Sequence, residues 1–387
     1  MKTIWLASWY PNKIFPFNGD FIKRHAAAVS LYEDVHVITV QRDETGSVTR
    51  STLKEEFSNG KLKETIVYYY CPKHRFSFYD KWRNERRYQR AFIKTIHETI
   101  KKEGKPHLVH VHVGMKAGVF ALWMKRNYGT PYVISEHWSG FLKEADKKFN
   151  DLPFYLRNSW NKIMTHCTGV SAVSMHLLNG VAKHFPNVSL ARIANVVDTS
   201  IFYPAPVMND IRFIHISGLQ PLKNPGDILR AFAIVVQTEQ SAKLDVFGSK
   251  NEEIIKLATD FGLQNAISFH EEIPQQELAM HMNKSTGLIL YSTFETFGCV
   301  IIEANACGLP VIVSDIPTFH ETVTEGENGY FVPLHSPEKL AQRMLELIKN
   351  RSSFNSNAIA TKTGSKYGYA VVGEQFSNWY REMLKQT

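Results

Sequence analysis

The segment from Thr286 to Asp315 constrains the fold of this chain more than any other. Its sequence, TGLILYSTFETFGCVIIEANACGLPVIVSD, holds two short apolar runs, Gly287–Tyr291 and Pro310–Ser314, on either side of a helix-like stretch that ends at Gly308. Runs this apolar are buried on both faces, which is typical of strands in a parallel sheet. The segment therefore predicts a β-loop-α-β unit.

The loop of this unit carries candidate ligand-binding groups. Ligands of parallel sheets lie beyond the carboxyl ends of the strands, so Glu295 is expected at the rim of the sheet. Gly298, near the helix start, permits close backbone approach, and free N–H groups there would face an anion such as a diphosphate. Glu303, inside the helix, would reach a ligand that lies along the first turns. Either glutamate is also compatible with an ordinary helix, through the helix dipole or as a solvated side chain.

The sequence ETFGCVIIEANACGLPVIVSD, from Glu295 to Asp315, resembles the glutamate-rich motif of retaining glycosyltransferases of family 4, which have the two-domain GT-B fold. The resemblance implies that Glu295 contacts the transferred sugar and Glu303 the nucleotide ribose, while Gly298 and Cys299 offer backbone N–H groups to the diphosphate. The donor-binding residues implied in this way are Gly218, Lys223, Glu295, Phe297, Gly298, Cys299, Val300 and Glu303.

Length and composition agree with two cytoplasmic domains. A chain of 387 residues suits two domains, and its apolar content is ample for two cores. Its four cysteines are scattered without a C-x-x-C pair, which favours a reducing compartment. The N-terminal apolar run is too short for a signal peptide, and no stretch approaches the ~18 apolar residues of a membrane span. We therefore expect a cytoplasmic protein, free or peripheral on the inner face of the plasma membrane.

The opening residues predict a Rossmann-like domain that is not a dinucleotide-binding one. Residues 3–40 follow a strand-helix-strand pattern, but the first loop holds a single glycine, Gly19, in place of G-x-G-x-x-G. In family 4 this loop faces the acceptor, so the resemblance makes Asn18, Gly19 and Asp20 candidate acceptor-binding residues. An ordinary loop and helix cap is the alternative. Arg42–Lys63 is expected to be an exposed loop or hairpin.

A basic amphipathic helix is predicted over Lys81–Lys102, because apolar residues recur at i, i+4 steps from Tyr88 to Ile100 while Lys and Arg populate the other side. Eleven Lys/Arg against four acids lie between Lys73 and Lys105, nearly the whole of the net charge of +8. Such helices bind anionic membranes or acidic partners, although a solvated helix face carries the same pattern. We expect peripheral contact with an anionic membrane through this helix, and no nucleic-acid partner.

Histidines mark the first domain. His110 and His112 alternate on one strand, and residues two apart share a face without making a metal site by themselves. His137 follows the strand Tyr132–Ser135 directly and is expected at the rim of that sheet. The sequence EHWSGF resembles family 4 at the point where a histidine lies at the reaction centre, so His137 is a catalytic candidate and Glu136 a further acceptor-binding one. The chain has no D-x-D sequence, and we expect neither a metal nor another cofactor.

The first turn of the second domain carries the predicted diphosphate contact. The sequence GLQPLKNP, from Gly218, matches the family's phosphate-binding lysine at Lys223. A lysine at a helix start opposes the helix dipole, which favours a phosphate contact over a structural role. The family usually has an arginine where Leu219 stands, and Gln220 or Arg230 could compensate.

Two Rossmann-like domains facing each other across a cleft are therefore expected. Residues 1–200 would bind the acceptor and residues 205–365 the nucleotide sugar, after a connection, NVVD followed by F-x-P, that resembles the family's. Arg351–Ser365 is predicted to be a Ser/Asn/Thr/Gly-rich link, and the helix within 367–387 is expected to cross back onto the first domain.

The resemblance implies hexosyl transfer with retention, from a nucleotide-diphosphate sugar to a sugar or lipid-linked hydroxyl acceptor, in bacterial surface polysaccharide or glycolipid assembly. The catalytic candidates are His137, Glu295 and Lys223. The departing diphosphate would take the acceptor proton, so no protein nucleophile is required. Two alternatives stay open: a nucleotide-sugar epimerase on the same fold, which needs no acceptor, and a non-catalytic scaffold that binds nucleotide sugars.

Overall fold

The computed structural model describes residues 1–44, 46, 48, 52–71, 77–206 and 210–386. The chain divides into two compact units, unit 1 being Met1–Asn195 with Tyr369–Thr387 and unit 2 being Val196–Gly368. The prediction of two α/β domains is confirmed. Lys73 and Arg75 of the predicted basic segment lie outside the described residues, as do residues 45, 47 and 49–51 of the predicted loop or hairpin.

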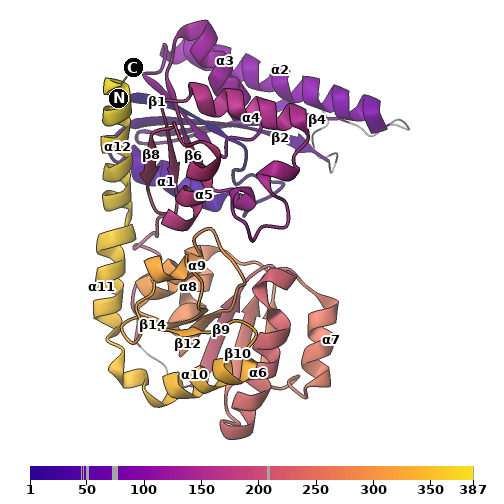
Figure 1. Cartoon of the computed structure of the whole chain (residues 1–387), viewed down its shortest axis with the longest axis vertical. Coiled ribbons are helices and arrows are strands. Elements are labelled where there is room, and N and C mark those ends of the chain that lie inside the picture. The colour runs from indigo at the N-terminus through magenta and orange to yellow at the C-terminus, as the bar shows by residue number, and fades with distance from the viewer. Residues whose placement is uncertain (45, 47, 49–51, 72–76, 207–209, 387) are drawn as a thin grey trace. The chain divides into compact units, whose positions relative to one another are not determined.

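Unit 1 is built on a mainly parallel sheet with helices on both faces. Its elements in chain order are β1 (Lys2–Ala7), α1 (Asp20–Ser30), β2 (Asp34–Asp43), β3 (Thr52–Asn59), β4 (Leu62–Tyr70), α2 (Ser77–Glu103), β5 (Leu108–His112), α3 (Gly118–Tyr128), β6 (Tyr132–Glu136), η1 (Ser139–Phe141), η2 (Phe149–Asp151), α4 (Phe154–His166), β7 (Gly169–Ala172), α5 (Met175–His184), β8 (Leu190–Arg192) and α12 (Tyr369–Lys385). The strand order is β3-β4-β2-β1-β5-β6-β7-β8. Helices α2, α3 and α4 cover one face of the sheet (Figure 1), and α1 lies on the other, packed against α12.

The strands of unit 1 are as buried as their sequences predict. All residues of β5, β6 and β7 are buried, which is why these strands are nearly continuous apolar runs. Among the described strands, β3 and β4 are the antiparallel pair, so part of the predicted loop or hairpin is a hairpin. Gly373 on α12 lies so close to α1 that an added Cβ would clash with the carbonyl oxygen of Ala28, so the C-terminal helix packs on unit 1. None of the described helices is long and apolar enough to cross a membrane.

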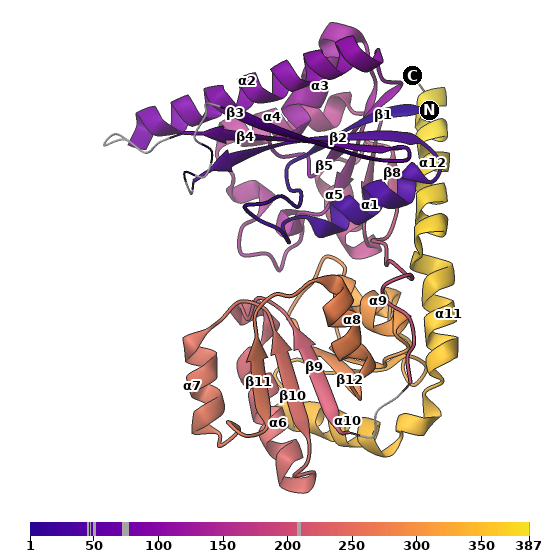
Figure 2. The same cartoon turned by 180° about the vertical axis from the view of Figure 1, so that it is seen from behind.

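Unit 2 has a parallel sheet in the order β11-β10-β9-β12-β13-β14. Its elements are β9 (Arg212–Ile216), η3 (Pro221–Lys223), α6 (Pro225–Thr238), β10 (Lys243–Phe247), α7 (Glu252–Asp260), β11 (Ile267–His270), α8 (Gln275–Asn283), β12 (Gly287–Leu290), α9 (Cys299–Ala306), β13 (Val311–Ser314), η4 (Phe319–Glu321), β14 (Gly329–Val332), α10 (Pro337–Lys349), η5 (Arg351–Ser353) and α11 (Ser356–Tyr367). Helices α6 and α10 pack together on one face of the sheet, and α8 and α9 lie on the other (Figure 2). The predicted strand-loop-helix-strand unit is β12-α9-β13.

The prediction of a link over Arg351–Ser365 is wrong, because most of that segment is the helix α11. The Asn355 side chain caps the helix by accepting from the backbone N–H of Ala358 at 3.0 Å. Ile359, Thr363 and Tyr367 recur at i, i+4 steps and are buried, so three side chains anchor the helix to the unit. The polar and small residues that resemble a link lie on its other side.

Candidate active site

In unit 2 the structure brings Lys223 and Glu295 together. Lys223 ends η3, which follows β9, and Glu295 lies in the loop between β12 and α9. Because β9 and β12 are neighbouring parallel strands, both residues lie beyond the carboxyl edge of the sheet. Their side chains form an ion pair in which the lysine is 18% and the glutamate 15% exposed. The pair is therefore partly shielded from water, where charges act on each other and on a ligand more strongly than on an open surface.

Hydrogen bonds fix the loop that carries Glu295. The hydroxyl of Ser292 donates to Oε1 of Glu295 at 3.0 Å, and that of Thr318 donates to the Glu295 carbonyl oxygen at 2.8 Å. The backbone N–H of Thr293 donates to the carbonyl oxygen of Leu222 at 2.8 Å, which ties this loop to the one that carries Lys223. The loop that carries Glu295 is thus held in place before a ligand binds.

Helix α9 begins beside Glu295 with the geometry of an anion-binding site. Gly298, at its N-cap position, has φ of +86°, a conformation that L side chains rarely adopt, and an added Cβ would lie 3.0 Å from the ring of Phe319. The first backbone N–H groups of an α-helix have no acceptor within the helix and carry the positive end of its dipole. In α9, which is described throughout, no acidic side chain occupies the first turn. The helix start is therefore open to an anion.

The remaining predicted donor-binding residues differ in how far their side chains are exposed. The Phe297 side chain is 1% exposed and packs edge-on against Tyr367, so its backbone alone could face a ligand. Gly218, Cys299 and Val300 are half-buried at the same edge of the sheet. Glu303 lies within α9 and is 4% exposed, and its contact with a ribose stays a prediction.

The position where the family usually has an arginine belongs to the core of unit 2. Leu219 is 4% exposed, packs in the hydrophobic cluster of the unit and has φ of +55°. Of the two residues predicted to compensate, Gln220 is exposed, and Arg230 on α6 is paired with Asp227 at 2.6 Å.

A buried histidine that the sequence reasoning missed supports this turn. His215 in β9 donates from Nδ1 to the carbonyl oxygen of Ile289 at 2.9 Å, so its Nε2 accepts from the hydroxyl of Ser217 at 2.7 Å. The same Ser217 oxygen accepts from the backbone N–H of Leu219 at 3.1 Å. Burial lowers the pKa of His215 to about 4, so the ring is neutral at neutral pH. The sequence feature that could have identified it is a lone histidine in the strand RFIHI, Arg212–Ile216.

In unit 1, β6 places His137 directly beyond its carboxyl end, where the sequence predicts it. The His137 side chain is buried, and its ring centroid lies 4.6 Å from that of Phe21 on α1. Burial, and then the neighbouring His25, lowers the pKa of His137 well below its usual value, so the imidazole is neutral at neutral pH.

Glu136 shapes the turn that presents His137. Its buried carboxylate accepts backbone N–H groups from His137 at 3.0 Å, Trp138 at 2.8 Å and Gly114 at 3.2 Å. Burial raises the pKa of Glu136 to about 7, although these hydrogen bonds lower it. The acceptor contact predicted for this residue stays a prediction.

The loop predicted to face the acceptor leads into the helix that packs on His137. Gly19 has φ of +71°, and an added Cβ would lie 2.7 Å from the carbonyl carbon of Trp9, so both conformation and space require glycine. Asp20 begins α1 and pairs with Arg24 at 3.1 Å, while Asn18 is half-buried. Two further histidines that the sequence reasoning did not connect with His137 lie beside it, His25 on α1 and His112 at the end of β5.

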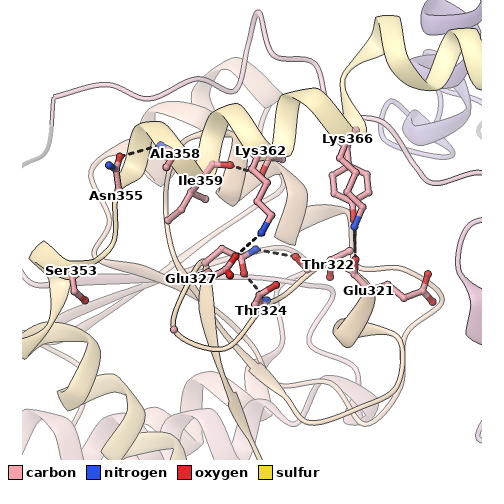
Figure 3. Close-up of a pocket in the computed structure, with 14 residues that line it drawn as sticks. Glu321, Thr322, Thr324, Glu327, Ser353, Asn355, Ala358, Ile359, Lys362 and Lys366 are labelled. Atoms are coloured by element: carbon pink, nitrogen blue, oxygen red, sulfur yellow. Dashed lines mark hydrogen bonds and ion pairs between the residues drawn. The ribbon is translucent and has the colours of Figure 1, made fainter.

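A pocket of about 340 Å³ lies elsewhere in unit 2, between α11 and the turn 324–328 (Figure 3). Polar groups in its wall are paired with one another: Lys362 with Glu327 at 2.5 Å, and Lys366 Nζ with the carbonyl oxygen of Glu321 at 3.0 Å. The turn precedes β14, so it lies at the amino edge of the parallel sheet, opposite the edge that carries Glu295. We assign the pocket no part in donor binding.

Two parallel-sheet units of this kind define the GT-B class of glycosyltransferases, and solved structures establish that fold for this chain. Sucrose-phosphate synthase from Thermosynechococcus elongatus superposes with a TM-score of 0.77 and 14% identity, over 100% of both chains. HepE of Anabaena, in complex with UDP-glucose, superposes with a TM-score of 0.73 and 16% identity, over 99% of this chain and 100% of that chain.

Sequence comparison then gives the family. The model described as Glycosyltransferase Family 4 matches residues 29–201, and that described as Glycosyl transferases group 1 matches residues 198–366. The chain belongs to glycosyltransferase family 4. It is 24% identical over 307 residues to a D-inositol 3-phosphate glycosyltransferase of Frankia alni, over 72% of this chain and 74% of that one. It is 27% identical over 194 residues to the N-acetyl-alpha-D-glucosaminyl L-malate synthase of Bacillus anthracis, which covers 47% of this chain and 50% of that one.

Proposed function

We propose that this glycosyltransferase moves a hexosyl group, with retention of its anomeric configuration, from a nucleotide-diphosphate sugar to an acceptor hydroxyl. The observation that carries the proposal is the Lys223–Glu295 pair beside the N-terminus of α9. An ammonium group and a helix N-terminus suit a diphosphate, and a carboxylate suits the hydroxyl groups of a sugar. The HepE complex with UDP-glucose supports a nucleotide-sugar donor on this fold.

Binding of the donor would separate the two charges. The diphosphate offers Lys223 a more highly charged partner than Glu295, so the ammonium group turns to phosphate and the carboxylate is released to the sugar hydroxyls. Lys223 and the N–H groups of α9 then stabilise the charge that develops on the departing diphosphate. As the bond from the anomeric carbon to the diphosphate breaks, the acceptor oxygen bonds to that carbon on the same face, and its proton passes to the diphosphate. No metal is required in this scheme.

The acceptor side of the reaction is assigned to unit 1. His137, neutral because it is buried, can exchange hydrogen bonds with a sugar or an acceptor without adding a charge near the reacting carbon. The turn Asn18–Asp20, which leads into α1 and so to Phe21 beside His137, is the proposed acceptor contact. Glu136 would contribute indirectly, because its carboxylate accepts the backbone N–H of His137 and so stabilises the turn that carries this residue.

Donor screening followed by product analysis tests the proposal. Thermal shifts with UDP-, GDP- and ADP-sugars identify the donor, since bound nucleotide raises the melting temperature by mass action. With that donor and a simple sugar acceptor, proton NMR should show nucleoside diphosphate together with a product of the donor's own anomeric configuration. An inverted product would contradict retention, and an epimerised donor in the absence of acceptor would favour the epimerase. Glu277→Ala, a change on the exposed face of α8, serves as a matched control for changes at Glu295.

We further propose that α2 holds the enzyme on an anionic membrane, where a lipid-linked acceptor for surface polysaccharide or glycolipid assembly is found. Tyr79 and Trp82 on this helix are 51% and 48% exposed, and the Arg86 guanidinium lies 4.5 Å above the Trp82 ring. A solvated helix has no need of exposed aromatic rings, whereas rings beside arginine suit the headgroup region of a bilayer.

Vesicle sedimentation tests this location. The protein should sediment with phosphatidylglycerol vesicles at low salt and not with phosphatidylcholine vesicles. Because each basic residue near an anionic surface contributes about 1 kcal/mol, reversing Arg83, Arg86, Arg87 and Arg90 to glutamate should weaken binding at least about 100-fold. Equal sedimentation of the wild type and this variant would refute the proposal and leave the transfer reaction untouched.

A further inference from the structure

Three buried imidazoles in unit 1 surround a single point. They belong to His25 on α1, His112 at the end of β5 and His137 just after β6. Their ring centroids are 5.8 Å apart for His25 and His112, 5.7 Å for His25 and His137, and 5.6 Å for His112 and His137. One nitrogen from each ring lies within 4.8 Å of the other two. A nearly equilateral triangle of rings is the arrangement that three histidines adopt around one metal ion.

The dimensions of this triangle fit a zinc-sized ion. With Zn–N distances of about 2.0–2.1 Å, a ring centre lies about 3.2 Å from the ion, so three rings at tetrahedral angles have centres about 5.2 Å apart, close to the 5.6–5.8 Å observed. Two nitrogens bound to one tetrahedral ion are about 3.4 Å apart. Nδ1 of His112 and Nε2 of His137 face each other at 3.4 Å. Two of the three proposed ligand atoms therefore already have the spacing of a shared ion.

The hydrogen bonds of His25 leave a lone pair for that third position. Its Nε2 lies 3.2 Å from the carbonyl oxygen of Ala194, so Nε2 carries the proton and Nδ1 the lone pair. This Nδ1 is buried and has no hydrogen-bond partner within the part of the chain that the structure describes. Metal-binding histidines usually donate their other N–H to a backbone carbonyl or a carboxylate in this way, and a buried lone pair without a partner costs free energy.

The surroundings favour neutral ligands. Imidazole binds metal in its neutral form, and burial lowers the pKa of all three histidines. Arg24 is the charged neighbour of His25 on α1, and its ion pair with Asp20 at 3.1 Å offsets its charge. The site is therefore compatible with a cation despite the nearby guanidinium group.

We infer that His25, His112 and His137 bind a divalent transition-metal ion of the zinc class, with a fourth position open to water. A metal ion here does not bridge the diphosphate, and the proposed transfer uses His137 but needs no metal. The consequence for activity rests on the proposed function: an occupied site takes the imidazole of His137 away from sugar and acceptor, so zinc should inhibit transfer reversibly.

Titration of the metal-free protein with Co²⁺ alone tests the site, because tetrahedral Co²⁺ has strong visible absorption bands. The wild type should bind one equivalent, and Zn²⁺ should displace it. His25→Asn and His112→Asn should each lower the affinity at least about 100-fold. His184→Asn, in the same unit but packed against Phe149, is the matched control and should bind like the wild type.

The wild type alone decides the question if the variants do not fold. X-ray absorption of the zinc-loaded protein should show three imidazole nitrogens at about 2.0–2.1 Å and a light fourth ligand. Binding below one equivalent, a shell without imidazole, or equal affinity in folded variants would overturn the inference. These measurements use neither donor nor acceptor, so their failure would leave the transfer reaction standing. With substrates present, Zn²⁺ should slow release of nucleoside diphosphate and a chelator should restore it.

Discussion

His215 should make unit 2 sensitive to acid. Its folded-state pKa is about 4, compared with 6.5 for an unperturbed histidine, because the ring is fully buried. Between these two values the unfolded chain binds more protons than the folded one, so the free energy of unfolding falls as the pH falls. The contribution of His215 is complete above pH 6.5. Protonation of Nε2 would also break the hydrogen bond that it accepts from Ser217.

The two pKa values set the size of the effect. Because of their difference, protonation of His215 should lower the free energy of unfolding by about 2 kcal/mol between pH 7 and pH 5. Urea unfolding followed by circular dichroism at both pH values measures this loss in the wild type and in His215→Gln. The variant is expected to be less stable at pH 7, since it loses the bonds to Ser217 and Ile289, and to lose about 2 kcal/mol less than the wild type on acidification.

Equal acid losses in the wild type and in His215→Gln would refute the reasoning, because the pH dependence would then come from other groups.

Three further predictions follow from the site and its loops. Lys223→Met should lower kcat about 100- to 1,000-fold through loss of a cation that stabilises the leaving diphosphate, and a loss below tenfold in steady-state diphosphate release would exclude that role. Gly298→Ala should lower the free energy of unfolding by about 1–2 kcal/mol because φ is +86°, and weaker donor binding should accompany it in calorimetry. Gly19→Ala should lower the free energy of unfolding by at least about 2 kcal/mol, because the added Cβ would clash with the Trp9 backbone and φ is also positive. An unchanged midpoint of urea unfolding would contradict this prediction.

The sequence predicts local features of the site better than distant ones. The β12-α9-β13 unit could be read from the chain because both strands are apolar runs and Gly298 and Gly308 bound the helix. Lys223 and Glu295 could each be predicted at a sheet edge, since each lies in the segment that connects a strand to the next helix. Their ion pair could not, because it depends on β9 and β12 being neighbours in a sheet whose order is not sequential.

The same reason explains what was missed in unit 1. His25, His112 and His137 come from three separate segments, and they meet because β1, β5 and β6 are adjacent and α1 follows β1. The spacing of these residues in the sequence does not indicate that their side chains are close in space. α11 was mistaken for a link because composition outweighed periodicity: its serines, threonines and glycine resemble a loop, while its contacts with the unit depend on Ile359, Thr363 and Tyr367.

The most direct test of the account measures hydrolysis of the matched nucleotide sugar in the absence of acceptor, for the wild type and for Glu295→Ala. Water can replace the acceptor slowly in a retaining transferase, so the wild type should release nucleoside diphosphate and free sugar, as should Glu277→Ala. Glu295→Ala should still fold and should release neither product above background. Equal release by the wild type and Glu295→Ala would contradict the central claim that this carboxylate, beside Lys223 and the start of α9, positions the transferred sugar.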